Sequence, residues 1–381
     1  MTRAPRATSS PIPTLSLIAA HHSSLPAVVH RCPLPQDRLD PSAHRVVLEG
    51  SSPIPRDDPR SGCPPGAISN TGTAFSSGGH AGGRAGRLRL VSRTDSPVSP
   101  GRLLAVSDVH VAYPENRRMV EDIAPGSSDD WLILAGDVAE TIADIETTLK
   151  QLSGRFAKVV WVPGNHELWT PKQDPVQLRG EQRYRHLVEI ARGLGVVTPE
   201  DPYPVWEGAG GPVVVAPLFV LYDYTFRPAE TATKEEALAL ARESGIVCTD
   251  EWVLHPDPYP TIDAWCRARV AQTRARLGDI DPTMPTVLVN HWPLVRQPTA
   301  VLRYPTFALW CGTTSTADWH TRFRASAVVY GHLHIPRTTW YDDVRFEEVS
   351  MGYPRERAAW GTPWSGLRQI LPFPAPPARR D

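Results

Sequence analysis

Five apolar segments of the chain each end in polar residues whose side chains could bind metal ions. The segments read RLLAVSDVH (102–110), DDWLILAGDVAE (129–140), FAKVVWVPGNHE (156–167), PTVLVNHWP (285–293) and SAVVYGHLH (326–334). Carboxylate, amide and imidazole groups suit Mn, Fe or Zn. One ion needs fewer ligands than these segments offer, whereas two ions about 3.5–4 Å apart that share one carboxylate would use all of them. The candidate metal ligands are Asp108, His110, Asp137, Asn165, His291, His332 and His334, with His166 as a further histidine beside them.

Each motif alone is a weak signal, because a histidine after a strand is usually an ordinary surface or core residue. Five such motifs in succession, each after an apolar run, favour a metal site. A glycine stands just before Asp137, Asn165 and His332, and a residue without a side chain lets the backbone turn sharply where ligands crowd together. The alternative to an enzyme is a non-catalytic protein with the same fold. The complete set of candidate ligands argues against this alternative. The histidines expected outside the site are His186, His255 and His320.

The candidate ligands can form one site only if the fold brings the ends of the five apolar segments together. Each apolar run is short and rich in β-branched residues, which is typical of a buried parallel strand, and helical spacing follows at 142–149 and 184–194. This alternation predicts an α/β domain with its site along one sheet edge. Further expected elements are one or two strands in 211–224, helices at 232–244 and 261–278 with a Pro-rich loop between them, and a hairpin over 338–350 that turns at Asp342 and Asp343. We expect the helix at 261–278 to be solvated, with Asp263 placed to pair with Arg267.

Composition divides the 381-residue chain near residue 100. The first hundred residues hold 14 Pro, 15 Ser and 9 Gly, and Phe75 is their only aromatic residue although the chain has 12 Trp, 10 Tyr and 8 Phe. So few bulky apolar side chains cannot offset the entropy lost on ordering the backbone. We therefore predict a disordered extension over 1–100, a catalytic domain over 101–370 and a Pro-rich disordered tail over 371–381. We also expect that much of 1–90 is inert or is not translated, with a start near Val91.

Charge and cysteine content exclude several classes of protein. The first hundred residues hold 11 Arg against 6 acidic residues, whereas the remaining 281 hold 29 basic and 35 acidic residues. An acidic body gives no electrostatic basis for binding nucleic acid. No apolar run approaches the roughly 18 residues of a membrane span, so we expect no membrane anchor. The five cysteines form no CxxC pair, which favours a reducing, cytoplasmic compartment.

The motifs DVH, GDVAE, GNHE, NH and GHLH together resemble the signature of the calcineurin-like metallophosphoesterases over about residues 101–350. The resemblance implies an αββα sandwich with two sheets, two metal ions and hydrolysis of a phosphoric ester by a metal-bridging hydroxide. It places Asp108, His110, Asp137 and His334 on the first metal, and Asp137, Asn165, His291 and His332 on the second. It also implies that Asp137 bridges the two metals and that His166 protonates the leaving oxygen. The family often has a Gly or Asp a few residues after the GD pair, where this chain reads GDVAE, so Glu140 has no assigned role here.

Longer stretches resemble one group within that family. DDWLILAGDVAE, FAKVVWVPGNHELW, LWCGTTSTADWHTRF and VYGHLHIPRTTWYDDVRFEEVSMGYPRE are similar to the actinobacterial metallophosphoesterases that release 4′-phosphopantetheine from carrier proteins. The resemblance implies an acyl carrier protein as substrate, and small phosphodiesters such as cyclic nucleotides are the alternative. Trp292 and Arg296 are candidate substrate contacts. A tryptophan in a segment that flanks the ligand motifs, as Trp292 does, more often fills the core. The same interpretation as core residues applies to Tyr222, Trp310 and Trp319, and Cys311 is expected to be buried and not a nucleophile.

Overall fold

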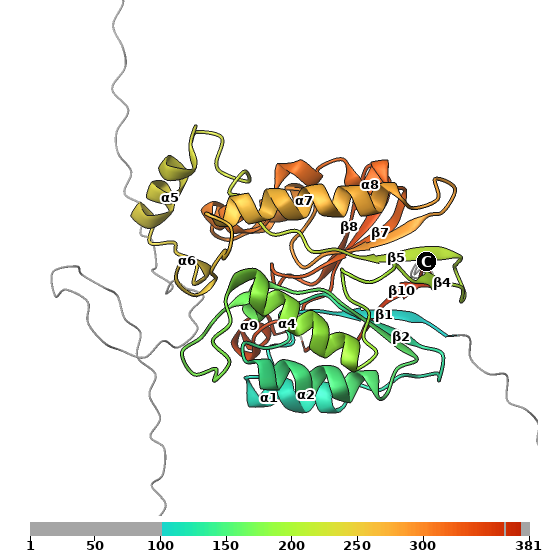
Figure 1. Ribbon diagram of the computed structural model, residues 1–381. Coiled ribbons are helices and arrows are strands. Elements are labelled where there is room, and N and C mark those ends of the chain that lie inside the picture. Colours follow the sequence, from blue (N-terminus) through green and yellow to red (C-terminus); the bar gives the residue numbers. More distant parts are fainter. Residues whose placement is uncertain (1–100, 362, 375–381) are drawn as a thin grey trace, which may run out of the picture. The chain divides into compact units, whose positions relative to one another are not determined.

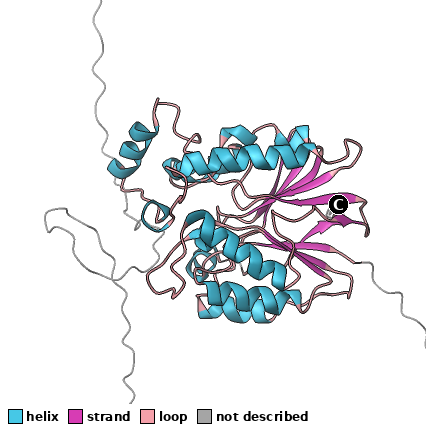
Figure 2. Ribbon diagram, in the orientation of Figure 1, coloured by secondary structure: helices cyan, strands magenta, loops and turns pink. Residues whose placement is uncertain are grey.

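The computed structural model describes residues 101–361 and 363–374 (Figure 1). The predictions for residues 1–100 and 375–381 concern segments outside these described residues. Within the described ranges, two β-sheets lie between two layers of helices (Figure 2). This arrangement confirms the predicted αββα sandwich of the α/β class.

The first sheet has four strands and the second has six. The first has the order β10-β1-β2-β3, in which β1, β2 and β3 are parallel and β10 is antiparallel to β1. The second has the order β4-β5-β6-β7-β9-β8, with a parallel centre from β5 to β9 and antiparallel edges. The strands are β1 (Leu103–Val106), β2 (Trp131–Leu134), β3 (Lys158–Trp161), β4 (Val205–Trp206), β5 (Val213–Pro217), β6 (Thr286–Val289), β7 (Ala325–Tyr330), β8 (Arg337–Tyr341), β9 (Val344–Glu348) and β10 (Arg368–Leu371).

The alternation of side chains along each strand divides the apolar interior into two cores. Leu103 and Ala105 of β1 face the core between the two sheets, whereas Leu104 and Val106 face the core beneath the helices. Successive residues of a strand point to opposite faces, so a central strand covered on both sides needs an unbroken apolar run. This requirement explains why the sequence shows runs such as LLAV and WLIL instead of an alternating pattern.

The helices cover the outer faces of the sheets. Helices α1, α2 and α4 lie beside the first sheet, and α7 and α8 lie beside the second (Figure 1). Threonine side chains cap α2, α5 and α7 by accepting a hydrogen bond from the first helical turn. No helix in the described ranges is long and apolar enough to cross a membrane. The helices are α1 (Pro114–Glu121), α2 (Ile142–Ser153), α3 (Asn165–Leu168), α4 (Gly180–Gly193), α5 (Lys234–Glu243), α6 (Asp250–Val253), α7 (Ile262–Gly278), α8 (Trp319–Arg322) and α9 (Pro354–Trp360), with 3₁₀ helices η1 (Gln297–Val301), η2 (Pro305–Trp310) and η3 (Thr314–Thr316).

The hairpin predicted over 338–350 is confirmed. Strands β8 and β9 pair antiparallel, and Asp342 and Asp343 turn between them with φ of 50° and 60°. Two successive residues with positive φ match the twist of the strands that they join.

Three details of the sequence analysis are wrong. Residues 250–253 form the short helix α6, although the sequence predicts only a Pro-rich loop between the helices at 232–244 and 261–278. Leu371, predicted as the first residue of the tail, is 1% exposed in β10, because it pairs with Leu103 and fills the core between the sheets. Helix α7 is not solvated all round, because Arg269 is buried against Glu200, although Arg267 does pair with Asp263 as expected.

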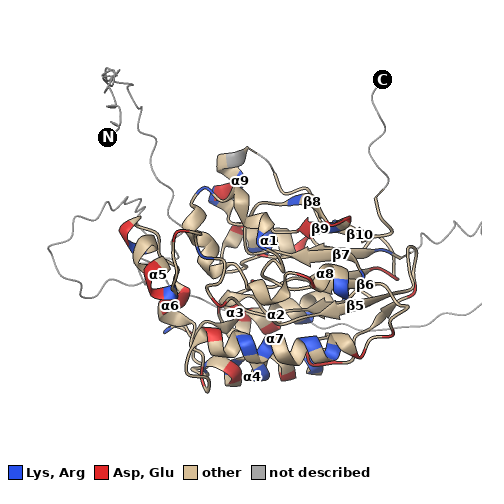
Figure 3. Cartoon of the chain, turned by 90° about the horizontal axis from the view of Figure 1, so that it is seen from above, with Lys and Arg blue, Asp and Glu red and all other residues tan. Residues whose placement is uncertain are grey.

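Charged side chains of both signs are mixed over the outer helices (Figure 3). On α4, Arg192 pairs with Asp201 at 2.8 Å, and on α7, Arg267 pairs with Asp263 at the same distance. On these helices, acidic side chains therefore neutralise part of the arginine charge.

Candidate metal centre

The candidate ligands lie directly after the carboxyl ends of five parallel strands. β1, β2 and β3 of the first sheet lead to Asp108, Asp137 and Asn165, and β6 and β7 of the second sheet lead to His291 and His332. Both sheets therefore supply side chains to one buried cluster. The remaining members of the cluster are His110, His166 and His334, and none of the eight residues is more than 9% exposed.

The backbone adopts left-handed conformations at five of these residues. A residue other than glycine with positive φ is uncommon, and such strain concentrates at functional sites. Of the nine such residues in the described ranges, five belong to the cluster. They are Asp108 (φ 52°), His110 (φ 39°), Asp137 (φ 56°), His332 (φ 71°) and His334 (φ 55°).

Two glycines allow the loops to approach one another. A Cβ atom at Gly164 would lie 2.1 Å from Oδ1 of Asp137, and one at Gly331 would lie 2.2 Å from Oδ2 of Asp108. A side chain at either position would therefore overlap a carboxylate of the cluster. This is the physical reason for the glycines in GNHE and GHLH.

Four residues form the first group of ligand atoms. The donor atoms of Asp108, His110, Asp137 and His334 all lie within 4.8 Å of one another. Nε2 of His334 is 3.0 Å from Oδ1 of Asp108 and 3.2 Å from Nε2 of His110. Carboxylate oxygens and imidazole nitrogens that converge in this way fit a metal cation.

A second group adjoins the first through Asp137. Nε2 of His291 lies 3.4 Å from Oδ2 of Asp137, 3.3 Å from Oδ1 of Asn165 and 3.3 Å from Nδ1 of His332. Nδ1 of His291 donates a hydrogen bond to the carbonyl oxygen of Ala135 at 2.9 Å, so in the neutral ring Nε2 is the nitrogen with a free lone pair. The second group therefore presents nitrogen and oxygen ligands toward a common point beside the first.

Burial and neighbouring charges set the protonation of the cluster. Burial, with a neighbouring imidazole in each case, lowers the pKa of His110 and of His332 to about 3. Burial opposes ionisation of Asp137, but His291 and His166 hold the pKa of that carboxyl well below its usual range. Metal binding requires neutral imidazoles and ionised carboxylates, which is the state that these shifts favour for the three residues.

For two other candidate ligands, His291 and His334, the opposite holds. Burial opposes protonation of both rings, but Asp137 raises the pKa of His291 to about 9, and Glu356 and Asp108 raise the pKa of His334 above its ordinary value. A bound cation would have to displace the proton from these two rings.

Residues outside the ligand motifs hold the first group in place. The hydroxyls of Ser107 and Ser350 donate to Oδ2 of Asp108 at 2.5 Å and 2.7 Å. Nδ1 of His334 donates to Oε2 of Glu356 at 2.7 Å, which turns Nε2 toward Asp108. These contacts fix the orientation of both ligands, and their donors and acceptors are themselves buried.

Two further buried carboxylates, Glu167 and Asp250, hold the loops that carry Asp137 and Asn165. Glu167 accepts hydrogen bonds from the backbone N–H groups of Asp137, Val138 and Gly164 at 2.7–2.9 Å, so it ties two ligand loops together. Oδ1 of Asp250 in α6 accepts from Nδ2 of Asn165 at 3.0 Å. Because the amide nitrogen of Asn165 faces Asp250, its oxygen Oδ1 faces His291.

His166 lies beside the cluster and is held on several sides. Its Nδ1 donates to Oε1 of Glu140 at 3.2 Å, and its Nε2 lies 3.4 Å from the hydroxyl of Tyr353 and 3.7 Å from Oδ2 of Asp137. The indole of Trp169 stacks on the ring with centroids 3.7 Å apart. Burial opposes protonation, but Asp137 and Glu140 raise the pKa of His166 above its ordinary value. A histidine held in this way can keep and then donate a proton.

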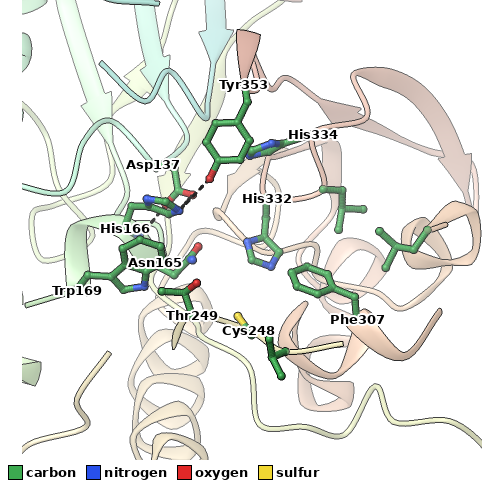
Figure 4. Close-up of a pocket in the computed structure, with 13 residues that line it drawn as sticks. Asp137, Asn165, His166, Trp169, Cys248, Thr249, Phe307, His332, His334 and Tyr353 are labelled. Atoms are coloured by element: carbon green, nitrogen blue, oxygen red, sulfur yellow. Dashed lines mark hydrogen bonds and ion pairs between the residues drawn. The ribbon is translucent and has the colours of Figure 1, made fainter. Parts of the chain in front are cut away.

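A pocket opens above the cluster (Figure 4). Asp137, Asn165, His166, His332 and His334 form its polar side, together with Tyr353. The structure does not bring the predicted substrate contacts into this lining. Trp292 is 1% exposed and packs edge-on against His291, and Arg296 is exposed elsewhere. The lining residues that the sequence analysis did not predict are Trp169, Val247, Cys248, Thr249, Leu302, Phe307, Leu333 and Tyr353.

The aromatic residues and the cysteine that the sequence assigns to the interior lie there. Tyr222, Trp310 and Trp319 are buried in the core beneath the helices, as expected for structural residues, and Cys311 is buried there too. His186, His255 and His320 lie outside the cluster. The structure places Glu140 beside His166. The sequence motif did not indicate this contact, because only the fold brings the two residues together.

The fold and the cluster fit a metal-dependent hydrolase of phosphoric esters, and comparison with known proteins shows the family. Residues 101–336 match the family described as Calcineurin-like phosphoesterase, and the chain belongs to that family. This confirms the family that the motifs indicated.

Two comparisons show a more particular likeness. The chain is 58% identical over 274 residues to the [Acyl-carrier-protein] phosphodiesterase PptH of Mycobacterium tuberculosis, an alignment that covers 71% of this chain and 84% of that protein. It is also similar to the crystal structure of Phosphopantetheinyl Hydrolase (PptH) from Mycobacterium tuberculosis, with a TM-score of 0.72 and 57% identity. That comparison covers 73% of this chain and 99% of the crystallised one.

Proposed function

We propose that this protein is a phosphodiesterase with two metal ions that releases 4′-phosphopantetheine from holo-acyl carrier protein and leaves the apo-carrier protein. The observation that carries the proposal is the 58% identity to a protein named as an acyl-carrier-protein phosphodiesterase. The pocket agrees with it, because a polar group of metal ligands adjoins an apolar wall.

The ligand groups suggest how two ions would be held. Asp108, His110, Asp137 and His334 would bind the first, and Asp137, Asn165, His291 and His332 would bind the second, with Asp137 shared. Oxygen and nitrogen ligands without sulfur fit Mn and Fe, and Zn is compatible. When bound, two such ions lower the pKa of a coordinated water and stabilise negative charge on the phosphoryl oxygens.

His166 is the proposed proton donor. Water loses one proton to the solvent and adds to phosphorus, the bond from phosphorus to the carrier-protein Ser oxygen breaks, and that oxygen takes a proton from Nε2 of His166. The solvent then returns a proton to His166. Glu140 holds Nδ1 of the same ring, which keeps Nε2 directed toward the polar side of the pocket. A proton donor in this role contributes about 10²- to 10⁴-fold in rate.

The cytoplasm is the proposed compartment. Cys248, Cys266 and Cys311, the cysteines in the described ranges, are buried free thiols. Free thiols are usual in a reducing compartment.

The deciding experiment incubates the full chain and Mn²⁺ with a purified holo-acyl carrier protein. The expected result is a loss of about 340 Da from the carrier protein by mass spectrometry, together with free 4′-phosphopantetheine. Parallel reactions contain a cyclic nucleotide or bis-p-nitrophenyl phosphate. Turnover of these small diesters with an unchanged carrier protein would contradict the proposed substrate.

A further inference from the structure

The pocket above the metal ligands has two chemically different sides. His166 and Trp169 lie on one side, and Phe307 lies on the other, with His332 between them (Figure 4). Besides Phe307, the apolar residues Leu302, Leu333 and Val247 belong to the lining. The two sides could therefore distinguish the two groups that are attached to the phosphate of an unsymmetrical diester.

The apolar side is built from three separate segments. Val247 and Cys248 come from the connection between α5 and α6, Leu302 and Phe307 come from the region of η1 and η2, and Leu333 stands between two candidate ligands. The ring of Phe307 lies nearly parallel to that of His332, with centroids 6.2 Å apart and an angle of 20°. Val247 is 42% exposed, so the apolar surface continues from the cluster to the solvent at that residue.

We propose that this apolar side, defined by Val247, Leu302, Phe307 and Leu333, binds the pantetheine arm that stays on the phosphate, while the carrier-protein Ser oxygen faces His166. This inference rests on the proposed function. The leaving Ser oxygen must lie near its proton donor, His166. The arm that stays on the phosphate therefore extends away from His166, past His332, toward Phe307 and Leu302.

The chemistry of the arm suits this wall. In 4′-phosphopantetheine a carbon with two methyl groups stands one methylene from the phosphate ester oxygen, and two amides follow it. The methyl groups would contact Leu302 and Phe307, where burial of apolar area is favourable. Thr249 adds a hydroxyl to the lining for the amide groups further along the arm.

The test compares two product-like inhibitors on the full chain with Mn²⁺. Hydrolysis of methyl p-nitrophenyl phosphate is inhibited with either 4′-phosphopantetheine or methyl phosphate, which share the phosphate but differ in the arm. We expect 4′-phosphopantetheine to bind at least about tenfold more tightly, since one well-buried methylene group is already worth that factor. Equal inhibition constants for the two compounds would overturn the proposal.

Two variants locate the effect on the wall. Leu302→Gln and Val247→Asn replace an apolar side chain with a polar one, and each should bring the ratio of the two inhibition constants toward one. The ratio is measured within each variant, so a general loss of activity cancels. Trp340→Ala is the control, because Trp340 is 63% exposed on β8 and does not line the pocket. A preference that survives in both wall variants would contradict the proposal.

The outcomes separate this inference from the proposed function. A protein that prefers 4′-phosphopantetheine as inhibitor through Leu302 and Val247 has the arm subsite even if it releases nothing from holo-carrier protein. A protein that cleaves holo-carrier protein with no such preference has the function but binds the arm elsewhere.

Discussion

At the scale of single residues, the contacts of His166 suit the proton transfer that we propose for it. Glu140 holds its Nδ1, Trp169 covers one face, and Nε2 is left toward Asp137 and Tyr353. Each contact limits the rotation of the ring, and Asp137 and Glu140 favour its protonated form. The arrangement places an imidazole with a raised pKa beside the proposed metal ligands without making it one of them.

The role of His166 predicts a loss of activity that depends on the leaving group. His166→Ala should lower kcat by about 10²- to 10⁴-fold with holo-carrier protein, whose Ser alkoxide needs a proton. The loss should be much smaller with bis-p-nitrophenyl phosphate, because p-nitrophenolate leaves without one. Metal content, measured by elemental analysis, should stay at the wild-type value. An equal loss with both substrates, or a loss of metal, would show that His166 acts in another way.

A second residue-scale prediction concerns Asp250. Asp250→Leu leaves the amide of Asn165 and Nε1 of Trp169 without their shared acceptor, so Asn165 is no longer held toward His291. Loss of such a supporting contact lowers metal affinity by about 10- to 100-fold. The expected result is a corresponding rise in the Mn²⁺ concentration for half-saturation, measured by calorimetric titration and by activity.

Asp250→Asn and Glu251→Gln are the matched controls for this prediction. Asn keeps a carbonyl oxygen that can accept the same hydrogen bonds, so it should restore most of the affinity. Glu251 is the neighbouring acid, but it accepts from Tyr224 and Trp310, away from the ligands. If all three variants lost affinity equally, Asp250 would have only a general structural role.

At the scale of elements, the sequence predicts the strands and their polar ends for a physical reason. A strand buried on both faces must be an apolar run, and ligands must follow it directly, so strand and ligand appear together in a motif such as LILAGD. The supporting contacts leave no such signal. Glu356 is 22 residues from His334, Asp250 is 85 residues from Asn165, and Ser350 is 242 residues from Asp108. Only the fold brings these partners together.

Short helices and strands are also hard to predict, because contacts with residues far away in the sequence determine them. Helix α6 has one turn, and its acidic start carries little helical pattern. Strand β10 has four residues, RQIL, of which only the last two are fully buried. Such segments owe their structure to the tertiary contacts that cover them, and propensity alone does not decide it.

The close approach of two ligand loops predicts the effect of a single methyl group. In Gly164→Ala the Cβ atom would lie 2.7 Å from the backbone nitrogen of Asp137, so the loops must separate. We expect a destabilisation of about 1–3 kcal/mol in urea unfolding, together with reduced metal content and activity. Gly193→Ala is the control, since a Cβ at this helical position meets nothing within 4 Å, and it should leave the protein as stable or slightly more stable. Equal behaviour of the two variants would contradict the steric argument.

At the scale of the whole molecule, the candidate metal centre joins the two sheets. Asp108, Asp137 and Asn165 follow strands of the first sheet, whereas His291 and His332 follow strands of the second. Ions held by both sets would link the sheets at their carboxyl edges, in addition to the apolar core between them. Metal binding should therefore stabilise the whole described domain and not only the loops that carry the ligands.

This link predicts how removal of metal changes thermal stability. A ligand present at 100 times its Kd stabilises the folded state by about 2.7 kcal/mol, which in a domain of this size raises the Tm by about 5–10 °C. Chelator-treated protein should therefore melt that much lower than protein with added Mn²⁺, in a single transition by calorimetry. His166→Ala should keep the full shift, whereas Asp137→Asn should lose most of it, because Asp137 belongs to both ligand groups. A shift that persists in Asp137→Asn would mean that the stabilising ions bind outside this cluster.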